Sequence, residues 1–313
     1  MRRWLGLLFV VLGSIDASNG DRSKIFDRCV TYCTNVTKTE CPAEKSAFGW
    51  VIGNCFRCRY DCMWETVRIF ESTAGIVPQF FGKWPFAAIV GPAGIVIQEP
   101  ASTLFSLLNL VEVWRMLRKL IRADKSMENR TGWIIYAHIG MITWISSTLF
   151  HIVDCSITEK LDYFSAFAFV LSLFYVSIVY LVNMSSKFQK LLLISMTLFY
   201  LHHIYMMNIE LDYSYNMTLC LTISALTTLI YVIYLVQRHR ISGRLTHSDF
   251  RLLYVLLWAA GAASLEILDF SPIFWIFDSH SLFHLATVPI PSLWWQFLAR
   301  TEDGSAQYYL KIA

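Results

Sequence analysis

Charged residues are scarce in this sequence. Asp, Glu, Lys and Arg make up 16% of its 313 residues, whereas hydrophobic residues make up 56%, and the mean hydropathy is +0.47. Soluble domains usually contain about 25% charged residues. The composition therefore excludes an ordinary soluble domain and predicts a polytopic membrane protein. The formal net charge of +3 is also too small to indicate a nucleic-acid-binding protein.

The first 20 residues are too short to form a membrane span with its flanks. Arg2 and Arg3 precede an apolar stretch at residues 4–13, and small residues follow around Ala17 and Ser18. This order is typical of a secretory signal peptide, so residues 1–20 are predicted to be cleaved, with an uncleaved anchor as the alternative. Cleavage would place the following residues in the secretory lumen.

Cysteine is almost absent after residue 62. Six of the eight cysteines lie before that point, namely Cys29, Cys33, Cys41, Cys55, Cys58 and Cys62. Cys55-x-x-Cys58 alone could be half of a zinc knuckle or a redox motif, but the oxidising lumen favours disulfides. The sequence does not select a pairing. Asn35-Val-Thr37 is a glycosylation acceptor. Residues 21–83 are therefore predicted to form a small disulfide-rich lumenal domain.

Long polar stretches are missing from the rest of the chain. Apolar segments of a length suited to a bilayer lie near residues 100–118, 132–153, 161–182, 189–208, 215–236, 252–268 and 279–299. They predict an all-α membrane protein with a seven-transmembrane helix bundle at residues 84–300. Residues 87–97 are apolar but short and rich in Gly and Pro, which favours an interfacial or re-entrant approach.

Basic residues are rare in alternate loops. The loops of one set contain Arg115, Arg118, Lys119, Arg122, Lys125, Arg130, Lys187, Lys190, Arg238, Arg240, Arg244 and Arg251. The opposite loops contain Lys160 and little else that is basic. The positive-inside rule assigns the first set to the cytosol, so the N-terminal domain is predicted to be lumenal and residues 301–313 to be a cytosolic tail.

A few polar residues interrupt the predicted spans. Ser147 and His151 are four residues apart and share a helix face, and Asp162 follows at the start of the next span. His280 and His284 form a second pair with the same spacing. The predicted topology puts all five at the lumenal ends of their helices. Ionisable groups are costly at that depth, so we expect them to have a function.

Three histidines match the ligand set of a hydrolytic zinc site, which leaves one position open for water. Zinc lowers the pKa of bound water to about 7. Asp162 would orient that water or act as general base. Ser147 would donate its hydroxyl to the developing oxyanion, or it would hydrogen-bond to one of the metal ligands and fix its orientation. A Ser-His-Asp triad is less favoured, because it gives His280 and His284 no task.

Two further acidic residues lie near the lumenal end of the sixth predicted span. Glu266 and Asp269 are candidates to line the same cavity. Both are therefore possible additional members of the site.

The pattern S-x-x-x-H, an aspartate and a late H-x-x-x-H resembles the CREST superfamily of seven-helix membrane hydrolases. Longer stretches narrow the resemblance: G-K-W-P-F at 82–86, Q-E-P-A-S at 98–102, F-S-L-L-N at 105–109, E-K-L-D-Y-F at 159–164, L-D-Y-S-Y-N at 211–216 and L-D-F-S-P-I-F-W at 268–275. Together with the cysteine-rich start, they resemble the post-GPI-attachment-to-proteins factor 3 family over nearly the whole mature chain.

The resemblance implies a phospholipase A2 specific for glycosylphosphatidylinositol (GPI), which removes the sn-2 acyl chain from the lipid of GPI-anchored proteins. It implies residence in the Golgi apparatus or endoplasmic reticulum membrane. By the same resemblance, the zinc ligands are His151, His280 and His284. The catalytic partners are Ser147 and Asp162. Glu99 matches an acidic residue at the head of the first helix.

Two alternatives use the same residues. A ceramidase-like amidase would share the zinc site, but ceramide needs no stapled lumenal domain, whereas a GPI substrate brings a glycan and a protein into the lumen. A seven-helix receptor with a structural zinc would leave the cysteines and Ser147 without a clear task. The GPI hydrolase is therefore the favoured interpretation.

Overall fold

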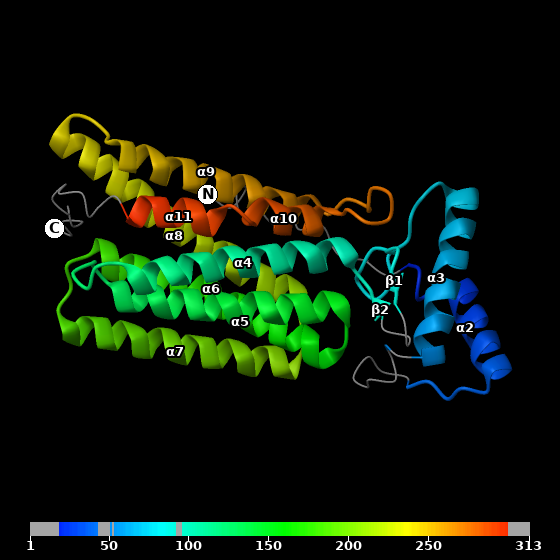
Figure 1. Ribbon diagram of the computed structural model, residues 1–313. Coiled ribbons are helices and arrows are strands. Elements are labelled where there is room, and N and C mark those ends of the chain that lie inside the picture. Colours follow the sequence, from blue (N-terminus) through cyan, green and yellow to red (C-terminus); the bar gives the residue numbers. More distant parts are fainter. Residues whose placement is uncertain (1–18, 43–50, 52, 92–95, 300–313) are drawn as a thin grey trace, which may run out of the picture. The chain divides into compact units, whose positions relative to one another are not determined.

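The structure is a computed structural model that describes residues 19–42, 51, 53–91 and 96–299 (Figure 1). All of the predicted signal peptide except residues 19 and 20, and all of the predicted tail, lie outside these residues. The chain divides into two compact units. The first unit contains the residues up to Pro100 together with 270–278, and the second contains 101–269 together with the residues from Ser279 onward.

Two helices dominate the first unit, α2 (Lys24–Thr37) and α3 (Gly53–Ala74). Three disulfides are present within this unit, and they join Cys29 to Cys62, Cys33 to Cys58 and Cys41 to Cys55. The pairing is nested, because Cys29 and Cys33 of α2 bond to cysteines of α3 in reverse order, and Cys41, which follows α2, bonds to the first cysteine of α3. Two helices that run in opposite directions produce this order. The prediction of disulfides is confirmed.

The apolar core of this helix pair is small. It contains Phe26, Cys62, Val67 and Phe80. The apolar segment at 87–97 contains two short strands, β1 (Ile89–Val90) and β2 (Val96–Ile97), paired antiparallel. Residues 92–95 between them lie outside the described part.

The second unit is a bundle of helices (Figure 1). They are α4 (Pro100–Arg122), α5 (Arg130–Ile152), α6 (Ser156–Leu181), α7 (Ser186–Ile209), α8 (Tyr213–Ser242), α9 (His247–Leu268), α10 (Ser279–Thr287) and α11 (Ile290–Leu298). Helix α6 packs against α5, α7 and α8, and both α10 and α11 pack against α9. Large aromatic residues fill the centre, where Trp133, Tyr231 and Phe297 are completely buried.

Five helices among the described residues, α5 to α9, are long and apolar enough to cross a membrane. The protein is therefore an all-α, multi-pass membrane protein. Helix α4 is as long as α5, with 23 residues, but Asn109, Glu112 and Arg115 lower its hydropathy. Exposed apolar side chains cover α7, of which only Met196, His203 and Met207 are buried. Contact with lipid explains this exposure.

The segment predicted as one last span, 279–299, forms two helices of nine residues each. Pro289 and Pro291 lie at the junction, and proline has no backbone N–H to donate to the preceding turn. Two of the three N–H groups at residues 289–291 are therefore missing, and the helix breaks between Thr287 and Ile290. This break affects the histidine site.

Candidate metal centre

Three histidines from two helices meet inside the second unit. His151 lies in the last turn of α5, and His280 and His284 lie one turn apart on α10. One nitrogen from each ring lies within 4.8 Å of the others. His151 and His284 are buried, and the Nε2 atoms of His280 and His284 are 2.9 Å apart. The structure thus brings the three predicted ligands together.

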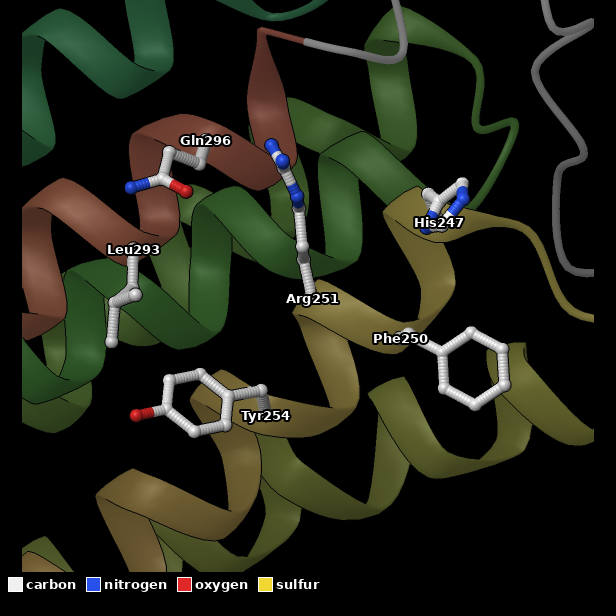
Figure 2. Close-up of a pocket in the computed structure, with 6 residues that line it drawn as sticks. All are labelled: His247, Phe250, Arg251, Tyr254, Leu293 and Gln296. Atoms are coloured by element: carbon white, nitrogen blue, oxygen red, sulfur yellow. The ribbon is translucent and has the colours of Figure 1, made fainter.

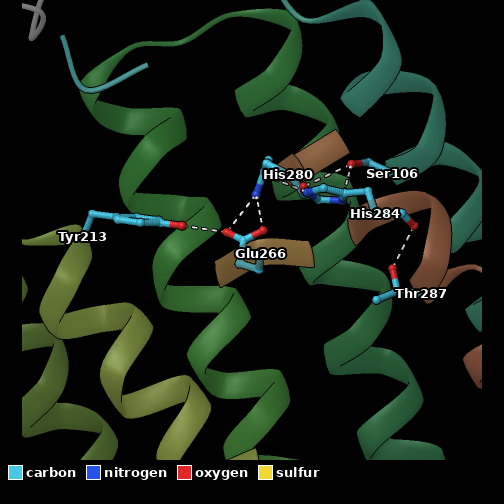
Figure 3. Close-up of polar contacts among 7 residues, drawn as sticks. Ser106, Tyr213, Glu266, His280, His284 and Thr287 are labelled. Atoms are coloured by element: carbon cyan, nitrogen blue, oxygen red, sulfur yellow. Dashed lines mark hydrogen bonds and ion pairs between the residues drawn. The ribbon is translucent and has the colours of Figure 1, made fainter. Parts of the chain in front are cut away.

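A carboxylate holds the outer nitrogen of His280 (Figure 3). His280 Nδ1 lies 2.9 and 2.8 Å from the two carboxylate oxygens of Glu266 on α9. Tyr213, in the first turn of α8, donates its hydroxyl to Glu266 Oε1 at 2.6 Å. A carboxylate only accepts, so His280 donates to it from Nδ1, and the neutral ring then presents its Nε2 lone pair to the other histidines. Glu266 therefore contacts the site through His280.

One serine contacts the outer nitrogen of His284, and a second serine contacts the first. Ser106 Oγ, on α4, lies 3.3 Å from His284 Nδ1 and 3.1 Å from Ser147 Oγ. Both serines are buried. Ser147, which the motif predicted, thus approaches His284 through Ser106. Sequence reasoning missed Ser106, although it lies within the F-S-L-L-N stretch that carried the family resemblance.

The carbonyl of His284 depends on a side chain from α4. In an unbroken helix Val288 N–H would donate to His284 O, but before Pro289 it donates to Leu285 O at 3.2 Å. Asn109 Nδ2 instead donates to His284 O at 2.7 Å, and Thr287 Oγ1 donates to it at 2.8 Å. Asn109 is completely buried. The helix break thus creates an acceptor that Asn109 satisfies, and sequence reasoning missed this residue too.

The other predicted residues are placed differently. Asp162 is half-buried in the second turn of α6, near the end of the bundle where His151 lies in the last turn of α5. Asp269 is exposed and ends α9 in the left-handed region, with φ 38. Glu99 belongs to the first unit, where it pairs with Lys83. Glu266 is therefore the additional acidic candidate for which a direct contact with a ligand histidine is observed.

The donor set fits a transition metal. Imidazole nitrogens suit zinc and related divalent ions, and three protein ligands leave a position for water. Histidines that bind metals usually donate their other ring N–H to a carboxylate, a carbonyl or water, as His280 does to Glu266. The site can therefore hold a metal ion through His151, His280 and His284.

A cleft of ≈ 320 Å³ lies at the other end of α9 (Figure 2). It is lined by His247, Phe250, Arg251, Tyr254, Leu293 and Gln296. Its distance from Glu266 is roughly 22 Å along the helix axis. The lining includes a single histidine and no carboxylate or serine, so it lacks the three-histidine ligand set and the acidic group of the predicted hydrolytic site.

Comparison with known proteins identifies the family of this chain. The model of the Per1-like family matches residues 42–301. This chain belongs to the Per1-like family. The predicted family resemblance is therefore confirmed, and the match includes every residue of the histidine cluster and its hydrogen-bond partners.

Curated relatives of this Per1-like chain cover nearly its whole length. GPI-specific phospholipase A2-like PGAP3 of Mus musculus is 33% identical over an alignment of 322 positions, which covers 97% of this chain and 94% of that protein. The Homo sapiens protein of the same name is 33% identical over 94% of this chain and 91% of its own length. Post-GPI attachment to proteins factor 3 of Drosophila melanogaster is 32% identical over 94% and 93%.

Proposed function

We propose that this protein is a zinc-dependent hydrolase that removes the sn-2 acyl chain from the phosphatidylinositol of GPI-anchored proteins. The single observation that carries this proposal is the meeting of His151, His280 and His284 in a multi-pass membrane protein. The names of the relatives supply the substrate class, since several are called GPI-specific phospholipase A2-like. GPI-anchored proteins are thus the proposed partners.

The three histidines would hold the zinc. When bound, the ion would supply a Lewis acid for the ester carbonyl and lower the pKa of water. Asp162 would accept a proton from the attacking water and return it to the departing sn-2 oxygen. A new bond from the water oxygen to the acyl carbon replaces the ester bond, giving a free fatty acid and a lyso-lipid. The contact of Ser147 with Ser106 supports a role in orienting His284, the second of its two predicted roles.

The proposed topology has seven spans with the N-terminus in the lumen. Helix α4 and the α10–α11 pair would be added to the five apolar helices, since nine and nine residues with a short junction approach the length of one span. We retain the proposed signal peptide (1–20), lumenal domain (21–83), bundle (84–300) and cytosolic tail (301–313), in a Golgi or endoplasmic reticulum membrane. The alternating basic loops support this orientation.

Glycosylation tests the topology. Asn35 is exposed on α2, so we expect a glycan there, whereas Asn129 and Asn183 should carry none because they lie in proposed cytosolic loops. Glycosidase digestion of single Asn→Gln variants measures this. A glycosidase-sensitive mass lost on replacing Asn129 would contradict the orientation and, with it, the lumenal position of the site.

Lipid analysis tests the activity. In cells that lack this protein, GPI anchors should keep an unsaturated sn-2 chain, and the wild-type chain should restore the remodelled lipid. Asp162→Asn should fail to restore it, while the matched control Asp124→Asn, in the exposed loop between α4 and α5, should succeed. Normal anchors in the deficient cells would refute the proposal. Accumulation of ceramide would instead favour the amidase, and bound metal without hydrolysis would favour the receptor.

A further inference from the structure

We propose that the two histidines of α10 are positioned by unlike partners: Glu266, supported by Tyr213, locks His280 in one tautomer, whereas Ser106 lets His284 exchange between two. The proposal rests on the metal centre of the proposed function. Tyr213, Glu266 and Ser106 are therefore positioning residues for metal binding, and none of them is a ligand.

The Glu266 contact is rigid for three reasons (Figure 3). Both of its oxygens lie within 2.9 Å of His280 Nδ1, so small rotations of the carboxylate keep the hydrogen bond. Tyr213 donates to Oε1 at 2.6 Å and restrains that rotation further. The Glu266 side chain is only 7% exposed, so water competes little for it. Since the carboxylate only accepts, His280 must keep its proton on Nδ1, and Nε2 stays available to a metal.

The Ser106 contact has no fixed direction. A hydroxyl both donates and accepts, and Ser106 Oγ lies between His284 Nδ1 and Ser147 Oγ. Ser106 can donate to His284 Nδ1 when the ring proton of His284 is on Nε2, and it can accept from His284 Nδ1 when that proton is on Nδ1.

Metal binding through His284 Nε2 requires the second of these two forms. The ring proton must then be on Nδ1, where it donates to Ser106 Oγ, and Ser106 donates to Ser147. The proton moves from one nitrogen of His284 to the other, so the number of bound protons does not change. A hydroxyl at position 106 accommodates both states, and a second hydroxyl at position 147 completes the chain.

This difference predicts unequal effects on metal affinity. Outer hydrogen-bond partners of metal ligands typically contribute 10–100-fold, and an anionic acceptor also raises the basicity of the imidazole. Glu266→Gln should therefore weaken binding by about 10–100-fold. Tyr213→Phe should weaken it less, because the carboxylate still accepts from His280. Ser106→Ala should also weaken it less than Glu266→Gln, and Ser106→Thr should restore the wild-type value because it keeps the hydroxyl.

The experiment is a Co²⁺ titration of the purified full-length chain in detergent, which gives the dissociation constant and the visible spectrum of bound Co²⁺. Two matched controls change the same residue types elsewhere: Glu112→Gln on α4, where Glu112 accepts from Ser292, and Tyr200→Phe on α7, where Tyr200 donates to Phe164 O. Both should bind Co²⁺ as the wild type does. Wild-type affinity in Glu266→Gln, or equal losses in Glu112→Gln, would overturn the proposal.

Two further outcomes are distinguished by the same titration. If Glu266→Gln does not fold, Tyr213→Phe carries the test, and an unchanged dissociation constant in that variant overturns the proposal. If the wild type binds no stoichiometric metal, the proposed metal centre fails as well. If metal binding is lost in His280→Ala but unchanged in Glu266→Gln, the metal centre stands and only the positioning role of Glu266 is overturned.

Discussion

The helix pair α2–α3 and the bundle α4–α11 are stabilised in different ways. The pair has a core of Phe26, Cys62, Val67 and Phe80, and three disulfides cross-link it. Small domains bury a small fraction of their surface and commonly depend on such cross-links. The bundle packs many large side chains and has no disulfide among its described residues. Its stability therefore depends on packing and on lipid.

The two regions also place their polar groups differently. Polar side chains of α2 face outward, as at the exposed Asn35. In the bundle, apolar residues such as Leu193 and Leu198 face outward, while His151 and Ser147 are buried. Buried polar groups must be hydrogen-bonded or must bind something. Polar groups at the centre of the bundle are therefore more informative about function than polar groups on α2.

The largest expected effect is loss of metal and activity from the bundle, which does not involve the disulfides of the helix pair. His280→Ala/His284→Ala should remove the metal and lower turnover by at least about 1,000-fold, since Lewis-acid stabilisation contributes several kcal/mol. Elemental analysis and the lipid assay measure this. His138→Ala, on the same helix as His151 but exposed, is the matched control. Full zinc occupancy in the double variant would refute the ligand assignment.

The second effect is confined to the helix pair. Removing a native disulfide from a small domain typically costs about 2–5 kcal/mol. Cys29→Ala/Cys62→Ala should destabilise α2 and α3 by that amount, because this disulfide closes the longest of the three loops, with a sequence separation of 33. Limited proteolysis in urea measures the loss.

The metal content of the bundle should not change in that variant. Cys220→Ala removes a free cysteine from α8 and is the matched control. Loss of metal in the disulfide variant would show that the two regions are coupled, and the comparison between them would then fail.

The cysteine pattern shows which features of the helix pair could be predicted from the sequence and which could not. Six cysteines behind a predicted signal peptide indicated disulfides, and these are present. The spacing of Cys29 and Cys33, four residues apart, matches that of Cys58 and Cys62. It fits a parallel pairing as well as the nested one that is observed. The relative direction of α2 and α3 decides between them, and it depends on tertiary packing.

The site was predictable only in its ionisable residues. His151, His280 and His284 stand out in apolar segments, and topology indicated that they would meet. Ser106 and Asn109 are common uncharged residues, and only the F-S-L-L-N stretch that carries the family resemblance draws attention to them. Their contacts with His284 depend on the approach of α4 to α10 and on the break at Pro289. Continuous apolar character concealed that break, although the prolines are visible in the sequence.

The third effect tests the carbonyl that the break releases. Asn109→Ala should leave His284 O with one donor fewer in a buried site, at a cost of about 1–3 kcal/mol. Thermal unfolding and the Co²⁺ dissociation constant measure the loss. Asn208→Ala is the matched control, since Asn208 also donates to a backbone carbonyl, Ile204 O, but is exposed on α7. Equal effects in the two variants would contradict a special role for Asn109.

The smallest effect applies one change to both regions. Ser23 caps α2 by accepting from Phe26 N at 3.1 Å, and Thr246 caps α9 by accepting from Asp249 N at 3.4 Å. Each substitution by Ala should cost about 1 kcal/mol. Thr228→Ala, in an exposed mid-helix position of α8, is the control and should cost little.

The consequences of the two cap substitutions should differ in extent. The first disulfide begins at Cys29, so the turn that contains Phe26 lies before any cross-link, and the cap holds it against the core. Ser23→Ala should therefore speed amide exchange in that turn and leave the residues after Cys29 protected. Helix α9 has no disulfide among its described residues, but Asp249 also pairs with Arg238 of α8 at 3.0 Å. Thr246→Ala should therefore speed amide exchange at the end of α8 and at the start of α9 together. If amide exchange becomes faster along all of α2 in Ser23→Ala, the disulfides do not confine the local unfolding to the first turn.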